Sequence, residues 1–349
     1  MPKVAVIVLH HADYAERYLE PCYRSLQRQT YAAEDFQVFL VSNGVGESAR
    51  RLIARIAPGA RTIEHARNLG WAGGNNSAIR IALEEGVRYT VLLNVDTVVE
   101  HTWLEALVEA AEAHPDVQVW QSTILLNGTG RIHSVGNRIH YLGYGYCNGY
   151  GHDATRPPEG CVMDFASGAA MLVKREVFET IGLFRYDYFI YGDDLEFCWR
   201  ARLAGFNVGL ADRSVCHHTY EFKTRLNMLY YFQRNRLLTL LTLPRLGTLL
   251  LTAPCLIVSE LVMAGYLIAG GWGGAMREVA RYFLRPKTWA AIRIRRRQIR
   301  RLRRRSDAEI VKGFAGRIVF AEVDHPLFRY VLNPLLALYW AVARPFIVW

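Results

Sequence analysis

Short apolar runs alternate with amphipathic stretches along the first part of the chain. The runs are rich in β-branched and aromatic residues and predict buried strands at residues 4–9, 37–41, 61–65, 89–94 and 117–125. The stretches between them predict helices at residues 14–28, 47–57, 73–85 and 103–114. Because strands and helices take turns, the pattern predicts an α/β fold, a mostly parallel sheet flanked by helices. Ligands bind beyond the carboxyl ends of the strands in such sheets, so residues that follow each strand are candidates for a functional site.

The pattern changes after residue 125. Residues 127–162 are rich in Gly, Tyr, His and Asn without clear periodicity and predict loops or irregular strands over the site. A strand is expected at residues 164–173, a helix at 193–204 and a short strand at 207–210. We predict an α/β domain over residues 1–236, which carries the candidate chemistry, and a helical, hydrophobic and basic region over residues 237–349.

The second region contains two strongly apolar segments, residues 237–251 and 255–269, interrupted by Pro244 and Pro254. A membrane-spanning helix needs about 20 apolar residues. Residues 246–269 reach that length but contain Pro254 and Glu260. A helical pair that re-enters the membrane or lies on its surface is therefore expected at least as strongly as a true span.

A dense basic block follows these segments. Residues 277–305 hold thirteen lysines and arginines against one acid, Glu278, although the net charge of the whole chain is only +10. Such a block predicts an anionic partner, either a membrane surface or nucleic acid. Apolar segments flank the block on both sides, which favours an anionic cytoplasmic leaflet over nucleic acid. The aromatic stretch at residues 326–349 is typical of an interfacial anchor, and a buried packing helix or an oligomer contact would have the same composition.

Composition limits the class and the compartment of the protein. A chain of 349 residues with 51% hydrophobic content can bury a full core, which excludes a disordered protein. Its six cysteines show no metal-binding or redox spacing, as expected in a reducing compartment. The apolar run at residues 4–9 is too short for a secretory signal. We expect a peripheral or monotopic protein on the cytoplasmic face of the cell membrane.

Asp96 ends the apolar run at residues 91–96 and is a candidate metal ligand. A carboxylate at this edge of the sheet suits Mg²⁺ or Mn²⁺ bound against a diphosphate. The alternative is that Asp96 caps a helix beginning near Val99. His217 and His218 follow the last predicted strand, and one of them would complete the coordination and favour Mn²⁺.

The segment at residues 67–76 combines Arg67 with three glycines and three asparagines and opens a predicted helix. Glycines permit close backbone approach or positive φ, and a helix N-terminus receives anionic oxygens. This is the layout of a nucleotide diphosphate site, while the alternative is an ordinary glycine-rich loop with asparagine caps. His10 and His11 also follow a strand, where a packing role is expected over nucleotide contact.

Asp193 and Asp194 open the helix predicted at residues 193–204. The helix macrodipole alone favours acids at such a position. A carboxylate there would also serve as a general base that removes the proton of an attacking hydroxyl.

The order of these elements resembles the family-2 glycosyltransferases of the GT-A fold, especially the bacterial branch similar to rhamnosyltransferases that act on lipid-linked or cell-wall glycans. The resemblance covers approximately residues 3–240. Its most specific pieces are residues 68–76, 92–96, 167–173, 193–194 and 230–236. The resemblance makes residues 1–236 a catalytic domain for an inverting hexosyltransferase that moves a sugar, rhamnose or another hexose, in a single displacement. The implied donor is a nucleoside-diphosphate sugar, with a divalent metal, Mn²⁺ or Mg²⁺, as cofactor. The implied acceptor is a polyprenyl-linked or cell-surface glycan.

Roles carry over to single positions of this sequence. The resemblance implies that Asp194 is the catalytic base, with Asp193 in support. It implies that Asp96 and His217 bind the metal, with His218 as the fallback. The donor contacts that it implies come from Ser42, Arg67, Asn68, Gly70, Gly73, Asn75, Asn94, Ser167 and Gly168.

Three departures from the family pattern concern donor recognition. Ser42 stands where the family usually has an Asp that contacts the nucleoside, so the base is not predicted. Arg185 and Tyr186 replace an acidic pair, and Asn94 replaces the first acid of the Asp-x-Asp motif. Two other functions remain open at this point, a sugar-phosphate nucleotidyltransferase and a catalytically silent membrane scaffold with the same fold. Oligomerisation is compatible with the sequence.

Overall fold

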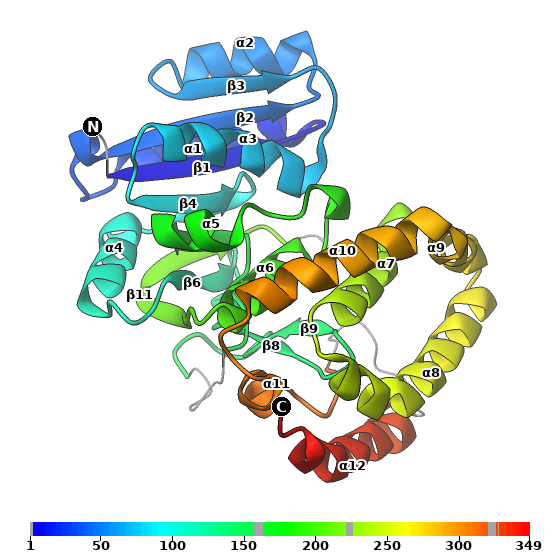
Figure 1. Ribbon diagram of the computed structural model, residues 1–349. Helices are drawn as coiled ribbons and strands as arrows, with labels where there is room; N and C mark the ends of the chain where they lie inside the picture. Colours follow the sequence, from blue (N-terminus) through cyan, green and yellow to red (C-terminus); the bar gives the residue numbers. More distant parts are fainter. Residues whose placement is uncertain (1–2, 157–162, 221–225, 320–325, 327) are drawn as a thin grey trace. The chain divides into compact units, whose positions relative to one another are not determined.

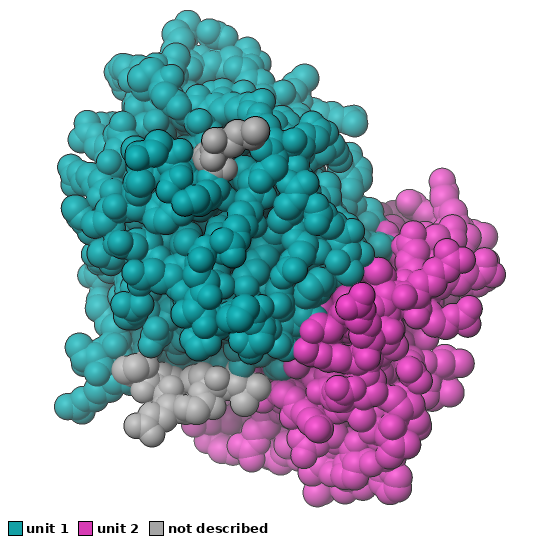
Figure 2. Space-filling model, turned by 60° about the vertical axis from the view of Figure 1, so that its left-hand side comes forward, with its two compact units in different colours: residues 1–137, 147–198, 206–221 teal, residues 138–146, 199–205, 222–349 magenta. Residues whose placement is uncertain are grey.

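The computed structural model describes residues 3–156, 163–220, 226–319, 326 and 328–349. The end of the predicted loop region, residues 157–162, lies outside the described residues. The chain divides into two compact units (Figure 2). Unit 1 comprises residues 1–137, 147–198 and 206–221, and unit 2 comprises residues 138–146, 199–205 and 222–349. The functional division at residue 236 stays a prediction.

Unit 1 is built on a large mixed sheet with the strand order β3-β2-β1-β4-β10-β6-β11-β5, to which β7 adds by pairing with β6. Its strands are β1 (Val4–His10), β2 (Phe36–Asn43), β3 (Arg61–His65), β4 (Tyr89–Asn94), β5 (Thr97–Val99), β6 (Val119–Leu126), β7 (Arg131–Ser134), β10 (Ala170–Lys174) and β11 (Val208–His218). Strands β1 to β4, β6 and β11 of this sheet are labelled in Figure 1. The pairs β3–β2, β2–β1, β1–β4 and β6–β11 are parallel. A separate two-stranded sheet pairs β8 (Asn137–Ile139) with β9 (Gly145–Cys147). The predicted fold class is confirmed.

Helices cover both faces of the sheet because its central strands are apolar on both sides. On β1, Val4, Val6 and Val8 belong to a core with η1 (Ala15–Leu19), α1 (Glu20–Gln27), α2 (Glu47–Ile56) and α4 (Trp103–Ala113). Alternate strand residues point to the opposite face, where α3 (Gly70–Glu84) packs against β1 and β2. Each fully buried side chain of this size contributes about 1.5–3 kcal/mol to stability. The remaining helices are α5 (Arg175–Ile181) and α6 (Asp193–Leu203), of which residues 199–203 belong to unit 2.

β10 and β11 differ most from their predicted bounds, and both differences shape the site. The expected strand at 164–173 begins only at Ala170, and β10 runs antiparallel to β4 with Ala170 opposite Leu93. The residues before β10 therefore cross the carboxyl end of β4. The strand expected at 207–210 extends to His218 through an irregularity between Ala211 and Val215.

Unit 2 is helical in its described residues after 226. Its helices are α7 (Leu226–Thr242), α8 (Leu246–Ala269), α9 (Gly273–Leu284), α10 (Pro286–Leu302), α11 (Asp307–Ile310) and α12 (Asn333–Ala343). α7 ends before Pro244, whereas α8 continues through Pro254. By length and composition alone, α8 is able to cross a membrane.

The basic block supplies internal contacts as well as exposed charge. Arg296 Nη1 donates to the carbonyl of Leu241 at 2.8 Å. Arg303 donates to the carbonyl of Leu243 at 2.6 Å and pairs with the buried carboxylate of Asp307. Other arginines of the block, Arg293, Arg297, Arg300, Arg301 and Arg304, are exposed. Some arginines of residues 277–305 therefore hold helices together, and only the others form an exposed cationic surface.

Candidate active site

Four chain segments of unit 1 meet where β4 ends. The first is the turn after β4, which carries Asp96. The second is the crossing segment, residues 167–169, which precedes β10. It reaches the end of β4 because the amide of Asn94 donates to the carbonyl of Ala169 at 3.0 Å. The third is the start of α6, because the amide of Gly168 donates to Asp194 Oδ2 at 3.1 Å. The fourth is the end of β11, where His218 lies opposite Thr97. The sheet topology thus brings the predicted catalytic and metal-binding segments together.

Asp96 faces His218 across this edge. Its Oδ1 lies 3.2 Å from His218 Nε2, and both side chains are largely buried. Residues 97–99 form strand β5, so no helix begins at Val99 and the helix-capping interpretation of Asp96 is wrong. Two ligand atoms that each lie about 2.1 Å from the same ion, with a ligand–ion–ligand angle near 90°, are roughly 3 Å apart. The oxygen and nitrogen therefore suit two neighbouring positions on one divalent ion.

Among the described residues, no group of three or more His, Cys, Asp or Glu side chains is placed to hold a metal ion. An ion held by Asp96 and His218 would need its remaining ligands from water or substrate. Mg²⁺ and Mn²⁺ are commonly bound this way, through one or two protein ligands together with substrate phosphates.

The two histidines of β11 point in different directions. His217 Nε2 lies 2.6 Å from Glu100 Oε1, an exposed carboxylate, while His218 faces Asp96. Neighbouring residues of a strand project to opposite faces, so only one of the pair can face the turn after β4. The geometry reverses the order predicted from sequence, and His218 rather than His217 is the histidine beside Asp96.

His133 of β7 holds the other side of the His218 ring. The Nδ1 atoms of the two rings are 3.1 Å apart, and the rings stack with centroids 5.0 Å apart. Burial and the neighbouring His218 lower the pKa of His133 to about 3, so His133 is neutral. A neutral His133 with its proton on Nε2 accepts from His218 Nδ1, which leaves His218 Nε2 free to bind a metal.

The acidic pair at the start of α6 is held in two different environments. Asp194 Oδ2 accepts from the amide of Gly168, and its Oδ1 accepts from the amide of Leu195 at 2.8 Å. Asp193 is only 5% exposed, and its Oδ2 has no hydrogen-bond partner among the described residues. Burial, followed by the charge of Asp194, raises the pKa of Asp193 to about 8. Asp193 therefore holds its proton more tightly than an ordinary carboxyl, while the amides of Gly168 and Leu195 stabilise negative charge on Asp194.

The crossing segment is fixed by two side chains that the sequence analysis did not select. Gln121 Oε1 accepts from the amide of Ser167 at 2.8 Å. Trp71 Nε1 donates to Asn94 Oδ1 at 3.3 Å, and a Cβ added at Gly168 would lie 2.4 Å from the Trp71 ring. The predicted donor-contact residues Asn94, Ser167 and Gly168 are therefore held together beside Asp194.

The glycine-rich segment makes its close approaches to protein atoms. Gly70 has φ +76°, and a Cβ there would lie 2.3 Å from the carbonyl oxygen of Phe189. A Cβ at Gly73 would lie 2.9 Å from Leu69, and Asn75 Nδ2 donates to the carbonyl of Trp71. The first amides of α3 are also engaged, because Gly70 N donates to Asn68 Oδ1 and Trp71 N to Phe189 O. The start of α3 is thus closely packed against the protein, and the donor roles predicted for these residues stay predictions.

The end of β2 is likewise closed by internal hydrogen bonds. Ser42 is 1% exposed, and its hydroxyl lies 3.0 Å from His10 Nε2. Asn43, which the sequence analysis passed over, donates to Asn68 Oδ1 and accepts from the amide of Leu69. Arg67, by contrast, is exposed and makes no hydrogen bond or ion pair to the described residues. Of the predicted residues after β2 and β3, Arg67 is thus the one whose charge is available to a ligand.

Residues 5–182 match the family model described as Glycosyl transferase family 2, which covers half of the chain. This chain belongs to glycosyltransferase family 2. The match is consistent with the arrangement of the sheet edge, the turn after β4 and the crossing segment before β10. The assignment to a rhamnosyltransferase-like branch stays a prediction.

The chain is similar to a curated relative and to solved structures. The relative is the low-salt glycan biosynthesis hexosyltransferase Agl10 of Haloferax volcanii, 27% identical over 164 residues, which are 42% of this chain and 48% of the relative. The chain thus matches about half the length of that protein. A mannosyltransferase of Pyrobaculum calidifontis, PcManGT with GDP-Man and Mn²⁺, has 16% identity, 86% coverage of each chain and a TM-score of 0.49. TarS 1–349 of S. aureus with UDP has 15% identity, covers 68% of this chain and 65% of its own, and has a TM-score of 0.46.

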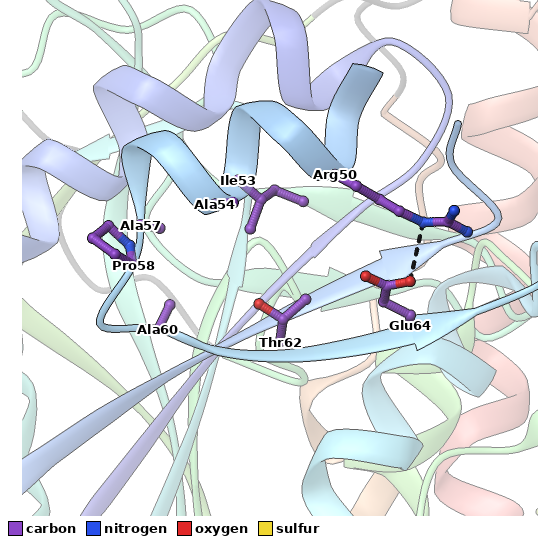
Figure 3. Close-up of a pocket in the computed structure, with 8 residues that line it drawn as sticks. All are labelled: Arg50, Ile53, Ala54, Ala57, Pro58, Ala60, Thr62 and Glu64. Atoms are coloured by element: carbon purple, nitrogen blue, oxygen red, sulfur yellow. Dashed lines mark ion pairs between the residues drawn. The ribbon is translucent and has the colours of Figure 1, made fainter. Parts of the chain in front are cut away.

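A shallow pocket lies apart from this site. It is formed between α2 and β3 and includes Ile53, Pro58 and Thr62, with Arg50 and Glu64 paired at 3.0 Å across one end (Figure 3). None of the predicted catalytic, metal-binding or donor-binding residues lines it. The candidate active site is therefore the edge of the sheet at the end of β4 and not this pocket.

Replacing Asp193 with Asn tests the electrostatics of the acidic pair. The folded-state pKa of about 8 lies above the ordinary value of 3.8, so the folded state holds a proton that the unfolded state loses as pH rises. The stability associated with this proton is fully present below pH 4 and is lost as pH rises towards 8. We expect the melting temperature of the wild type, relative to Asp193→Asn, to fall between pH 5 and pH 8. Parallel curves in differential scanning fluorimetry would contradict this assignment.

Proposed function

We propose that this protein transfers a hexose from a nucleoside-diphosphate sugar to an acceptor hydroxyl, with inversion at the anomeric carbon and with a divalent metal at Asp96 and His218. The observation that carries the proposal is the convergence of Asp96, His218 and Asp194 at the carboxyl end of β4. Family membership supports the reaction class. The identity of the sugar as a hexose, the use of a divalent metal and the acceptor are parts of this proposal that go beyond family membership.

Asp194 is the group that accepts the proton. Its carboxylate is anchored by the amides of Gly168 and Leu195, which fix its orientation without neutralising it. Burial raises the pKa of Asp194 above the ordinary carboxyl value of 3.8, which makes it a stronger base than an exposed carboxylate. As the acceptor hydroxyl attacks the anomeric carbon, its proton passes to Asp194, and the bond from that carbon to the diphosphate oxygen breaks.

Asp96 and His218 are the residues that would hold the divalent metal. When bound, the ion supplies positive charge beside the departing diphosphate. Arg67 is exposed and free of protein partners among the described residues, which suits contact with the anionic donor. Trp71, Gln121 and the amide of Asn94 hold the crossing segment, so that the sugar site would be formed by fixed groups.

The acceptor in this proposal is a polyprenyl-linked or cell-surface glycan, reached from the cytoplasmic face of the membrane. Its support is the apolar and basic composition of residues 237–349. Exposed arginines of α10 offer bidentate contacts to a lipid-linked pyrophosphate.

A donor screen tests the reaction. The purified full chain is incubated with a panel of nucleotide-sugars and Mn²⁺ or Mg²⁺, and release of nucleoside diphosphate is measured with and without lipid-linked acceptors. The proposal expects metal-dependent release from one donor, with the sugar recovered in the opposite anomeric configuration on the acceptor. Pyrophosphate release from a nucleoside triphosphate and a sugar phosphate would instead identify a nucleotidyltransferase. Absence of release from every donor would contradict the proposal.

His133 provides a test that does not depend on turnover. Replacing His133 with Phe keeps an aromatic ring against His218 but removes the nitrogen 3.1 Å from its Nδ1. Loss of an outer partner of a metal-binding histidine costs about 10–100-fold in metal affinity. We expect that weakening for Mn²⁺, measured by electron paramagnetic resonance in the presence of nucleoside diphosphate. His114→Phe, near Trp120 on another edge, is the control and should leave the affinity unchanged. Equal affinities in the wild type and His133→Phe would contradict the role.

A further inference from the structure

Helix α8 of unit 2 has its polar and apolar side chains in reversed positions. Its buried residues are Thr248, Thr252, Ser259 and Leu267, three of which carry hydroxyl groups. Its exposed large apolar residues, between 41% and 70% exposed, are Leu246, Leu250, Ile257, Val258, Leu261, Val262, Tyr266 and Ile268. A helix that faces water shows the opposite arrangement, with an apolar stripe towards the core. The outer flank of α8 therefore does not have the composition of a water-facing surface.

The polar side chains of α8 whose contacts are known all contact residues of unit 2. Thr248 Oγ1 donates to the buried Asp307 Oδ2. Glu260, the one charged residue of the helix, pairs with Arg236, whose side chain is 2% exposed. These contacts lie twelve residues apart along α8 and hold one flank of the helix against unit 2. A helix packed in this way meets a membrane with its outer flank only and is not surrounded by lipid.

Helix α12 extends the same surface. Tyr339 Oη donates to the carbonyl of Leu251 at 2.5 Å, which joins α12 directly to α8. On α12, Leu335, Leu338 and Val342 are 59%, 64% and 60% exposed. Large contiguous apolar patches are rare on soluble monomers and mark sites of protein or membrane contact.

Cations and a tryptophan lie beside this surface. Helix α9 packs against α8, and the corner between α9 and α10 exposes Leu284 and Trp289 at 80% and 43%. Arg277 of α9, Lys287 of α10 and Arg285 between the two helices are exposed. Tryptophan and basic side chains are enriched at membrane interfaces, where the charges meet anionic headgroups. Exposed cations beside an apolar face match an anionic bilayer better than a second apolar protein surface.

We infer that the outer flanks of α8 and α12 insert shallowly into an anionic bilayer, with the cations of α9 and α10 at the headgroups. The attachment is monotopic: apolar side chains enter the boundary between headgroups and acyl chains, to a depth of about 5–10 Å, and α8 does not cross. This inference concerns unit 2 by itself and does not depend on the proposed sugar transfer.

Vesicle flotation of the full chain tests the surface. The variant Leu250→Glu with Leu261→Glu places two charges on the outer flank, where both native side chains are exposed and the fold is not disturbed. The matched control, Gln27→Glu with Ala54→Glu, adds the same charge at exposed positions of α1 and α2. On vesicles of phosphatidylcholine mixed with phosphatidylglycerol, we expect the α8 variant to bind about tenfold more weakly or worse. The control should bind like the wild type.

Further measurements distinguish the alternatives. Binding should weaken on vesicles of phosphatidylcholine alone and in high salt, because the cationic contribution is screened. Failure of the wild type to bind the anionic vesicles, or undiminished binding of the α8 variant, would overturn the inference. So would a dimer in light scattering that the α8 variant dissociates, since the flank would then be covered by a second copy. Donor turnover measured in parallel separates the two proposals, because an inactive chain that still floats with vesicles contradicts only the proposed function.

Discussion

Replacing Asp194 with Asn is expected to lower the transfer rate by about 10²–10⁴, the usual contribution of a general base. Asn cannot take up the proton of the acceptor hydroxyl, and its amide group would face one of the two amides that now donate to Asp194. Donor and metal binding should persist, because Asp96 and His218 are untouched. The measurement is single-turnover transfer together with nucleotide affinity by calorimetry.

The pH profile adds a second readout for the same residue. Since burial raises the pKa of Asp194, activity should fall on the acid side at a pH above the ordinary carboxyl value of 3.8. This acid limb should be absent from the residual activity of Asp194→Asn. Glu176→Gln is the control, because Glu176 is also a carboxylate in the first turn of a helix, α5, but is exposed. If Asp194→Asn turned over at the wild-type rate, its role as the base would be excluded.

Loss of metal-dependent donor binding is the second large effect, expected for Asp96→Ala and for His218→Ala. Each removes one of the two protein donors that stand 3.2 Å apart. The loss should exceed the about 10–100-fold that an outer partner contributes. Titration of Mn²⁺ in the presence of nucleoside diphosphate measures it directly, and transfer should fall in parallel.

His217→Ala is the matched control in the same strand. Its partner Glu100 is exposed, and an exposed pair of this kind contributes about 1 kcal/mol or less. We therefore expect near wild-type metal affinity for this variant. The opposite result, with His217→Ala impaired and His218→Ala normal, would restore the assignment made from sequence and reject the one made from geometry.

Local pattern predicted most of the α/β elements and failed where a longer-range contact decided the outcome. β3 and β4 have the predicted bounds, because an apolar run bounded by polar residues is sufficient to define a buried strand. Pro254 does not end α8, which is held along one flank by packing and by the ion pair of Glu260 with Arg236. The short strand expected at 207–210 continues to His218, because β6 and β5 pair with its extension.

The choice between His217 and His218 shows why adjacent residues cannot be separated from sequence. In β11, Ala211 pairs with Ser122 and Val215 pairs with Thr123, so residues 212–214 are inserted into the strand. An odd insertion reverses which side chains reach each face beyond it. His133 gave no signal at all, because it lies in a segment without periodicity and becomes relevant only when β7 pairs with β6. Asn43 could have been found, as a polar residue that ends an apolar strand next to Ser42.

The sequence by itself determined the fold class, the family and the identity of the segments that meet at the site. These follow from side-chain periodicity and from the order of short motifs, both of which are local properties of the chain. Only the tertiary structure decided that His218 faces Asp96, that two backbone amides donate to Asp194, and that the first glycines of α3 pack against Phe189 and Leu69. Strand register, burial and the direction of each side chain set these features, and all three depend on residues far apart in the sequence.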